Sequence, residues 1–388
     1  MDKECIGCGL CETMCHKQAI TIGENRNGSF CTIDKELCDN CSVCKKICPI
    51  ENIKIQENLS DVQHVAVGRS RDENVVKVSA SGGIVSELLI YLFNTEQIDA
   101  AIVAHFDEYA NIYGDIIESA NDVLRHSGSY YHTSKQLINV NKVRKYKKVA
   151  VVGLPCHIEG IINYCHLTRQ EEKVIKIALF CTVGRTYEGF RKFFKKQTGF
   201  DVTNGKVKKY ISRYSDKKLI HIEDDVGNVY ECPDELYKFS MDFFYANKSC
   251  LNCRKLYGLS ADICIGDAWH RVIEKNGIKE KMAIISANTT YGSQLLDILQ
   301  KNLSLELVDN GPLELISSQK YGVGLKQLHN ERIIRGLACI RMLRYFNENA
   351  LMHRVNCRIR GELLNRLALD TEKRKQKLKA KWNAPEGL

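Results

Sequence analysis

The first 58 residues contain one four-cysteine pattern twice, and this repeat constrains the fold more than any other feature. Each copy has the spacing C-x2-C-x2-C-x3-C, and every cysteine of the second copy lies 33 positions after its counterpart. An apolar segment follows each copy, at 19–22 and at 52–55. We therefore predict two copies of one unit, each with a ligand loop, a short helix and a strand, related by an approximate two-fold axis. The cysteines are Cys5, Cys8, Cys11, Cys15, Cys38, Cys41, Cys44 and Cys48.

This spacing is typical of small proteins that bind two 4Fe–4S clusters. Three closely spaced cysteines surround one cluster, and the fourth cysteine of the same copy reaches the other cluster. A pair of zinc sites is the alternative, but tandem zinc modules have no reason to use four cysteines at this compressed spacing twice. We predict that one cluster is bound by Cys5, Cys8, Cys11 and Cys48. We predict that the other is bound by Cys38, Cys41, Cys44 and Cys15.

Three residues of the repeat need separate comment. Pro49 follows the last cysteine of the second copy, as in bacterial ferredoxins, whereas His16 stands at the matching place in the first copy. We expect this change to affect the turn and not the number of ligands. Cys31 fits neither ligand set, and we expect it to be an ordinary buried or surface thiol.

The cysteine count and the charge distribution limit the class of protein. A total of 18 cysteines in 388 residues, without a secretory signal, favours metal or redox chemistry over disulfides. No run of 18 uncharged apolar residues occurs, so we expect a cytoplasmic protein without a membrane span. The net charge is +9, and residues 331–388 alone hold 14 Lys and Arg against 6 Asp and Glu. We therefore predict a basic helical tail at 328–388 and no nucleic-acid partner.

Alternating strand and helix signals begin after residue 60. The pattern predicts strands at 65–70, 99–106, 147–153, 174–181 and 282–288, with more strands inside 206–232. It predicts helices at 81–96, 154–164, 187–199 and 292–302. The predicted fold is therefore an α+β, ferredoxin-like two-cluster domain at 1–58, followed by an α/β domain with a mixed sheet at 59–327 and the helical basic tail.

One short segment of the larger domain can approach an anionic cofactor. Ser81, Gly82 and Gly83 lie between a predicted strand and a predicted helix. Backbone N–H groups at such a turn can contact a phosphate or the edge of a flavin. A simple N-cap of the helix by Ser81 is the alternative explanation.

Four further cysteines can form a metal site in the larger domain. Cys250 and Cys253 form a C-x2-C pair, which needs two more ligands to complete a tetrahedral set. Cys156 and Cys181 each stand at the end of a predicted strand, where open α/β sheets bind ligands. A buried structural role is the alternative for Cys156.

These segments occur in an order that resembles one family. The segments are SGG at 81–83, GLPCH at 153–157, LFC at 179–181, KSCLNC at 248–253 and ADICIGDAW at 261–269. They are similar to those of the coenzyme F420 hydrogenase/dehydrogenase beta-subunit family, over roughly residues 1–310. That family includes deazaflavin-oxidising subunits of hydrogenase and formate dehydrogenase, ferredoxin-dependent pigment reductases, and relatives associated with bacterial polysaccharide genes.

The resemblance implies a third 4Fe–4S cluster and an FAD in the larger domain. The residues that match the third cluster are Cys156, Cys181, Cys250 and Cys253. The residues that match the flavin site are Ser81, Gly82, Gly83, Ser129 and Tyr131. Asp267, in the GDAW turn, is either a cofactor contact or a turn-capping carboxylate. We expect His157 to be a neighbour of the third cluster rather than a proton donor, and no catalytic residue is predicted.

The main functional hypothesis is an oxidoreductase that passes electrons between its clusters and a two-electron partner or small-molecule substrate through FAD. Clusters pass single electrons, organic substrates usually exchange two, and a flavin can do both. The redox carrier is ferredoxin or coenzyme F420, and the resemblance suggests a link to polysaccharide synthesis. The alternatives are a coenzyme F420-oxidising electron-input subunit of a larger complex, and a cluster-binding protein without turnover.

Overall fold

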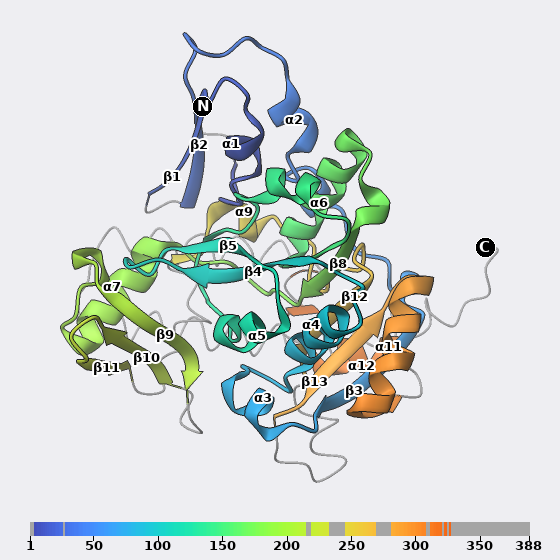
Figure 1. Cartoon of the computed structure of the whole chain (residues 1–388). Helices are drawn as coiled ribbons and strands as arrows, with labels where there is room; N and C mark the ends of the chain where they lie inside the picture. Colours follow the sequence, from blue (N-terminus) through green and yellow to red (C-terminus); the bar gives the residue numbers. More distant parts are fainter. Residues whose placement is uncertain are drawn as a thin grey trace.

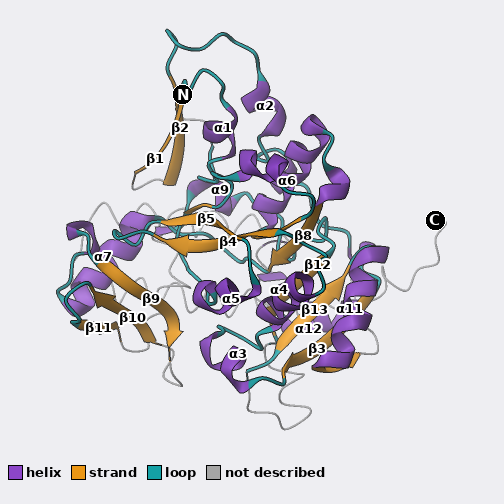
Figure 2. Cartoon of the chain, in the orientation of Figure 1, coloured by secondary structure: helices purple, strands orange, loops and turns teal. Residues whose placement is uncertain are grey.

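The computed structural model describes residues 4–25, 28–214, 219–232, 245–268, 281–307, 311–319, 322–323 and 326. The predicted basic tail at 328–388 lies outside these residues. Figure 1 follows the chain and Figure 2 separates its helices from its strands. The strands are β1 Ile20–Asn25, β2 Gly28–Ile33, β3 His64–Ser70, β4 Ala100–Phe106, β5 Ile112–Ile117, β6 Ser134–Lys135, β7 Val149–Gly153, β8 Val174–Leu179, β9 Val207–Tyr214, β10 Leu219–Asp224, β11 Val229–Cys232, β12 Ile263–Asp267, β13 Ala283–Ala287 and β14 Leu303–Leu307.

Most of the helices are short, and several follow a strand directly. The α-helices are α1 Leu10–Met14, α2 Val43–Ile47, α3 Glu73–Val78, α4 Ile84–Asn94, α5 Ala120–Val123, α6 Pro155–Thr168, α7 Tyr187–Thr198, α9 Lys248–Leu251, α11 Thr290–Asn302 and α12 Gly311–Ser318. Single 3-10 turns are η1 Asn52–Lys54, η2 Leu59–Asp61, η3 Leu124–His126, η4 Val140–Lys145, η5 Glu171–Lys173 and η6 Val202–Asn204. No helix among the described residues has both the length and the apolar character needed to cross a bilayer.

A nine-stranded mixed sheet forms the centre of the larger domain, as predicted. Its strand order is β14-β3-β13-β12-β8-β7-β4-β5-β6. The central strands β12, β8, β7 and β4 run parallel to one another. The flanking pairs β12–β13, β13–β3, β3–β14 and β4–β5 are antiparallel. Because β7 and β8 are parallel neighbours, their carboxyl ends at 153 and 179 open at the same edge of the sheet.

The two faces of this sheet bury different partners, because alternate residues of a strand point to opposite faces. Ala101 and Val103 of β4 pack with the apolar residues of α4 and α11. Ala100 and Ile102 pack on the other face, with Ile161 of α6 and with apolar residues of α1 and α2. The N-terminal segment, at the top of Figure 1, is therefore seated on the face that α6 covers.

The N-terminal segment forms a ferredoxin-like unit, but only its first copy contributes strands. β1 and β2 form an antiparallel hairpin, with Ile22 opposite Cys31. The second apolar segment, 52–55, contains the 3-10 turn η1 instead of the predicted strand. That prediction is wrong because the segment pairs with the larger domain and not with a strand. The carbonyl of Ile53 accepts a hydrogen bond from the backbone N–H of Arg254 at 2.8 Å.

A small antiparallel sheet packs beside the main sheet. Its order is β11-β10-β9, and these strands lie within the predicted range 206–232. Phe190 and Phe194 of α7 pack on its buried residues, among them Tyr210. Arg213, near the end of β9, has a positive φ of 60°, which is uncommon for a residue with a side chain.

Candidate iron–sulfur and cofactor site

The structure brings together the four cysteines that we assigned to the first cluster. The thiol of Cys8 lies within electrostatic range of Cys5 and of Cys48, and Cys11 lies within range of Cys8 and Cys5. Burial, the largest cause, raises the pKa of Cys5 to about 11 and that of Cys8 to about 12. A cationic cluster would convert such buried, neutral thiols to thiolates.

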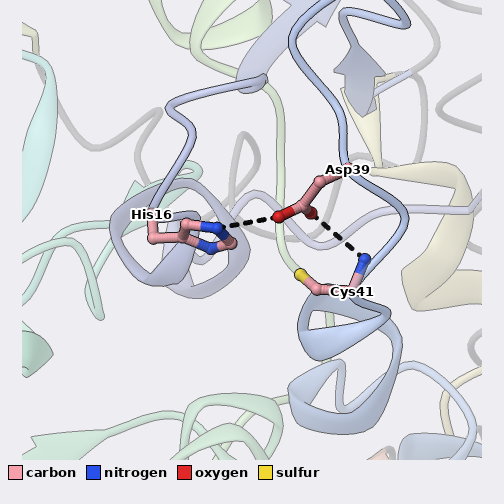
Figure 3. Close-up of side chains that lie close together, drawn as sticks. All are labelled: His16, Asp39 and Cys41. Carbon is pink, nitrogen blue, oxygen red and sulfur yellow. Dashed lines mark hydrogen bonds and ion pairs between the residues drawn. The ribbon is translucent and has the colours of Figure 1, made fainter.

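Three cysteines of the second set also lie together. The thiol of Cys44 lies within electrostatic range of Cys41 and Cys38. The two copies meet beside this set, where Nε2 of His16 forms an ion pair with Asp39 at 2.8 Å (Figure 3). The other carboxylate oxygen of Asp39 accepts the backbone N–H of Cys41 at 3.2 Å. The histidine that replaces proline in the first copy thus fixes the ligand loop of the second copy.

Cys31 has a neighbour that the sequence did not indicate. It interacts with Cys11, and this interaction is the largest cause that raises the pKa of the Cys11 thiol. Cys31 also lies within electrostatic range of Cys44. It is therefore a half-buried thiol on β2 close to both ligand sets, although the ligand spacing does not include it.

The structure gathers the third set of cysteines around one cavity. Cys156, Cys181, Cys250 and Cys253 all line this cavity. Cys156 begins α6 after β7, Cys181 follows β8, and the other two come from α9 and the turn after it. Burial raises the pKa of Cys181 to about 12. The parallel pair β7–β8 thus brings together residues that are 25 positions apart in the sequence, as the strand-end prediction expected.

The first and third sets are neighbours. The thiol of Cys156 lies within electrostatic range of Cys181, Cys253 and Cys250, and also of Cys8 from the N-terminal segment. Ile6 and Ile53 of that segment line the cavity of the third set. Cys8 thus joins the first set to the third, and Cys31 lies near both the first and the second set, so the three thiol sets form a series from the exposed Cys41 to Cys156.

A larger cavity of about 400 Å³ opens at the same edge of the sheet. Pockets for small molecules and cofactors commonly have volumes of about 300–1,000 Å³. All the residues that we expected at the flavin line it: Ser81, Gly82, Gly83, Ser129, Tyr131 and Asp267. The chain thus holds a cofactor-sized cavity lined by these residues.

The segment 81–83 is shaped by close packing. The N-cap of α4 is Gly83, at φ 79°, so the expected alternative of an N-cap at Ser81 is wrong. The Ser81 hydroxyl instead donates to the carbonyl of Met282 at 2.8 Å. A Cβ at position 82 would lie 2.7 Å from the carbonyl oxygen of Gly68, so only glycine fits there. The glycines therefore let the loop pack closely against the paired strands β3 and β13, with the N-terminus of α4 at the cavity.

The two cavities share a wall. Cys181, His157 and His132 are among the residues that line both. Burial lowers the pKa of His157 to about 4, and its Nδ1 accepts the backbone N–H of Leu154 at 3.2 Å. His157 is thus a neutral neighbour of the third thiol set, as we expected.

Sequence reasoning missed two polar residues of the larger cavity. His132 stacks on Phe190 with ring centroids 4.6 Å apart, and neither of its buried ring nitrogens has a hydrogen-bond partner among the described residues. Arg213 crosses from the small sheet and pairs with Asp267 at 2.7 Å. The position of His132 beside Tyr131 could have indicated it, whereas no local pattern in the sequence indicates Arg213.

This arrangement defines an iron–sulfur oxidoreductase with a cofactor cavity. Residues 4–60 match the 4Fe-4S dicluster domain. Residues 65–140 match the N-terminal part, and residues 146–311 the C-terminal part, of the coenzyme F420 hydrogenase/dehydrogenase beta subunit. The chain belongs to the coenzyme F420 hydrogenase/dehydrogenase beta-subunit family.

Several curated proteins are similar to the chain. One of the subunits of the F(420)H(2) dehydrogenase of Methanosarcina mazei is 27% identical, over 71% of this chain and 80% of its own length. The beta subunit of the coenzyme F420 hydrogenase of Methanococcus voltae is 25% identical, over 66% of this chain and 94% of its own. The coenzyme F420-dependent sulfite reductase of Methanocaldococcus jannaschii is 27% identical, over 68% of this chain but only 42% of its own.

One solved structure shares the fold. A polypeptide of the F420-reducing [NiFe] hydrogenase complex from Methanosarcina barkeri superposes with a TM-score of 0.52 and 20% identity. The match covers 72% of this chain and 94% of that polypeptide. At this identity the likeness concerns the fold alone.

Proposed function

We propose that this chain exchanges electrons between coenzyme F420 and its iron–sulfur clusters, as the electron-input module of a larger assembly. The observation that carries the proposal is the shared wall between the 400 Å³ cavity and the cavity of the third thiol set. The names of the relatives favour coenzyme F420 over an unidentified organic substrate. This proposal replaces our main hypothesis with its alternative, and it includes the domain limits 1–58 and 59–327 and a cytoplasmic location.

The proposal includes three 4Fe–4S clusters, with the ligands assigned from the sequence. The third set supports a cluster because four thiols, none of them in a disulfide, line one cavity, where Cys253 is buried and the other three are half-buried. Such thiols become thiolates when a cationic cluster binds them, because its charge offsets the cost of their burial. The proximity of Cys8 to Cys156 supports single-electron transfer between the N-terminal clusters and the third cluster.

The proposal also includes FAD in the larger cavity. Unpartnered nitrogens of His132 and the N-terminus of α4 support a polar, anionic ligand there. Ser81, Gly82 and Gly83 would hold that ligand, with Tyr131 against it. FAD, when bound, exchanges two electrons with an organic partner and single electrons with a cluster. Leu179 and Phe180 also line this cavity and give it apolar surface.

A second candidate is the ferredoxin-driven reductase. The exposed Cys41 of the second thiol set and the exposed Cys48 of the first support it, because they leave the N-terminal sets accessible to an external one-electron carrier. The same exit serves either direction of electron flow, so the candidates differ only in which end receives electrons first. The relatives named above give no support to a link with polysaccharide synthesis.

Cofactor analysis and a comparison of donors test the proposal. Anaerobically reconstituted protein should hold about twelve irons per chain, as expected for three clusters, and one FAD. Reduced coenzyme F420 should be oxidised by the full chain when a one-electron acceptor is present. If only reduced ferredoxin delivers electrons to the flavin, the ferredoxin-driven candidate replaces the proposal. A content of about eight irons per chain would contradict the third cluster. Stoichiometric zinc would contradict the proposed electron transfer.

A further inference from the structure

A buried lysine faces the third set of cysteines. Lys326 is 1% exposed and lines the cavity that Cys156, Cys181, Cys250 and Cys253 surround. Its ammonium group donates a hydrogen bond to the backbone carbonyl of Cys250 at 3.2 Å. A fully buried ammonium group is costly unless charges of opposite sign stabilise it.

Cys181, Cys250 and Cys253 line the same cavity as the ammonium group of Lys326. Thiolates bound to a cluster there would supply the negative charge that stabilises this group. The ion pairs between described residues do not include Lys326. By contrast, Lys255, the other lysine of this cavity, pairs with Glu159 at 2.9 Å. The charge of Lys255 is thus matched locally, whereas that of Lys326 faces the ligand set.

Two further polar groups near these cysteines also stabilise negative charge on their sulfurs. The backbone N–H of Gly184 donates to the sulfur of Cys250 at 3.3 Å. The guanidinium of Arg185 lies within electrostatic range of both Cys181 and Cys250. Net charge and hydrogen bonds to the sulfurs are two of the factors that set the reduction potential of a cluster.

We propose that Lys326 makes the cluster at Cys156, Cys181, Cys250 and Cys253 easier to reduce, by stabilising the negative charge that the cluster gains. This inference rests on the third cluster of the proposed function. In the step concerned, the cluster gains one electron and no proton, and its net charge changes from about −2 to about −3. The donor is the reduced flavin, which reduced coenzyme F420 supplies with two electrons at a time.

The charge of Lys326 matters because of where the third cluster lies. It lies between the larger cavity, which shares Cys181, and the first thiol set, which Cys8 represents. A higher potential at this junction favours removal of single electrons from the two-electron cofactor. Lys326 would thus act through its charge on the cluster, since it contacts the ligand residues and not the substrate.

The experiment is an anaerobic redox titration, followed by electron paramagnetic resonance, on the full chain, three variants of Lys326 and one control variant. Lys326→Met and Lys326→Gln remove the charge, and Lys326→Arg keeps it. At the potential where the wild-type cluster is half reduced, we expect the ratio of reduced to oxidised cluster to fall about tenfold in the neutral variants, which corresponds to about 59 mV for one electron. Lys77→Met, at an exposed lysine of α3, is the matched control.

The outcomes separate this inference from the proposed function. A potential that falls in both neutral variants and is retained in Lys326→Arg and Lys77→Met supports it. An unchanged potential in a neutral variant that holds the cluster overturns it and leaves the three-cluster proposal intact. If the neutral variants lose the cluster while Lys326→Arg keeps it, Lys326 serves assembly and the inference is wrong. Absence of the third cluster from the wild type overturns both.

Discussion

The buried carboxylate of Glu57 accepts a hydrogen bond from the backbone N–H of Tyr257 at 2.9 Å. The same carboxylate accepts the other three N–H groups of segment 256–259. This segment begins three residues after Cys253, so one side chain from the end of the N-terminal unit fixes the loop beside the third thiol set. The contact joins the two predicted domains next to the cavity where they meet.

The first prediction is that Glu57→Gln loosens this loop. Glutamine is uncharged and offers one acceptor oxygen in place of two, so all four N–H groups lose a charged partner and two of them lose their acceptor. We expect a loss of about 1–3 kcal/mol in the free energy of unfolding, measured by urea denaturation of the anaerobic protein. We also expect faster loss of the third cluster to a chelator. Asp61→Asn, at an exposed carboxylate nearby, should change neither property.

The second prediction assigns the ligands by substitution. Cys250→Ser and Cys253→Ser should remove only the third cluster, because the N-terminal unit has its own eight cysteines. Cys31→Ser should retain all the clusters, although its thiol contacts Cys11. Electron paramagnetic resonance of the reduced variants measures this. Loss of a signal in Cys31→Ser, together with an intact spectrum in Cys15→Ser, would show that our ligand assignment is wrong.

The third prediction concerns the close packing of Gly82. A methyl group there would overlap the carbonyl of Gly68, so Gly82→Ala must displace the loop at the larger cavity. We expect a loss of about 1–3 kcal/mol in stability and a lower content of FAD per chain. Gly199→Ala, at the end of α7, is the control because its Cβ would meet nothing within 4 Å, although its φ of 81° is strained. That variant should lose stability but keep FAD.

The fourth prediction is a pH effect of His132. Burial lowers its pKa from 6.5 to about 4, with a smaller opposing contribution from the Thr133 backbone. Below pH 6.5, His132 therefore binds a proton in the unfolded chain but stays neutral in the folded chain. The stability contributed by the neutral ring is complete above that pH and is lost progressively as the pH falls toward 4.

The variant His132→Phe keeps the stacking on Phe190 but cannot titrate. Between about pH 7 and about pH 5.5, the free energy of unfolding should fall by about 1 kcal/mol more for the wild type than for the variant. Urea denaturation of both proteins at each pH measures the difference, in which the matching effect of His157 cancels. Equal losses in the two proteins would contradict the neutral, buried state of His132.

Features with short-range spacing could be predicted, and features that join distant segments could not. The cysteine repeat was readable because a cluster fixes the spacing of its ligands within a few residues. Cys156 and Cys181 could be paired because each ends a strand. Lys326, Arg213 and Glu57 carry no local signal, since their partners lie 54 to 202 positions away.

The missed elements have a similar cause. β12 crosses the segment that we treated only as a motif, at 261–269, because a short apolar run does not distinguish a strand from a turn. The predicted strand at 52–55 had the right apolar pattern, but its partner is the backbone of Arg254 in the other domain. The apolar pattern of a segment indicates that it is buried, but the segment with which it pairs decides its secondary structure.

The last prediction separates electron entry from electron exit. The double variant Cys38→Ser and Cys41→Ser removes the second cluster, whose ligand Cys41 is exposed, and leaves the thiols next to the larger cavity in place. If coenzyme F420 is the donor, its reduced form should still reduce the flavin of the variant at the wild-type rate, because hydride transfer needs no cluster. Transfer onward to an external one-electron acceptor should slow severely, since the exposed exit is lost. Anaerobic stopped-flow absorbance follows the two steps separately. If the variant instead keeps fast reduction of the acceptor, electrons do not leave through the second cluster at Cys41, and the proposed route is wrong.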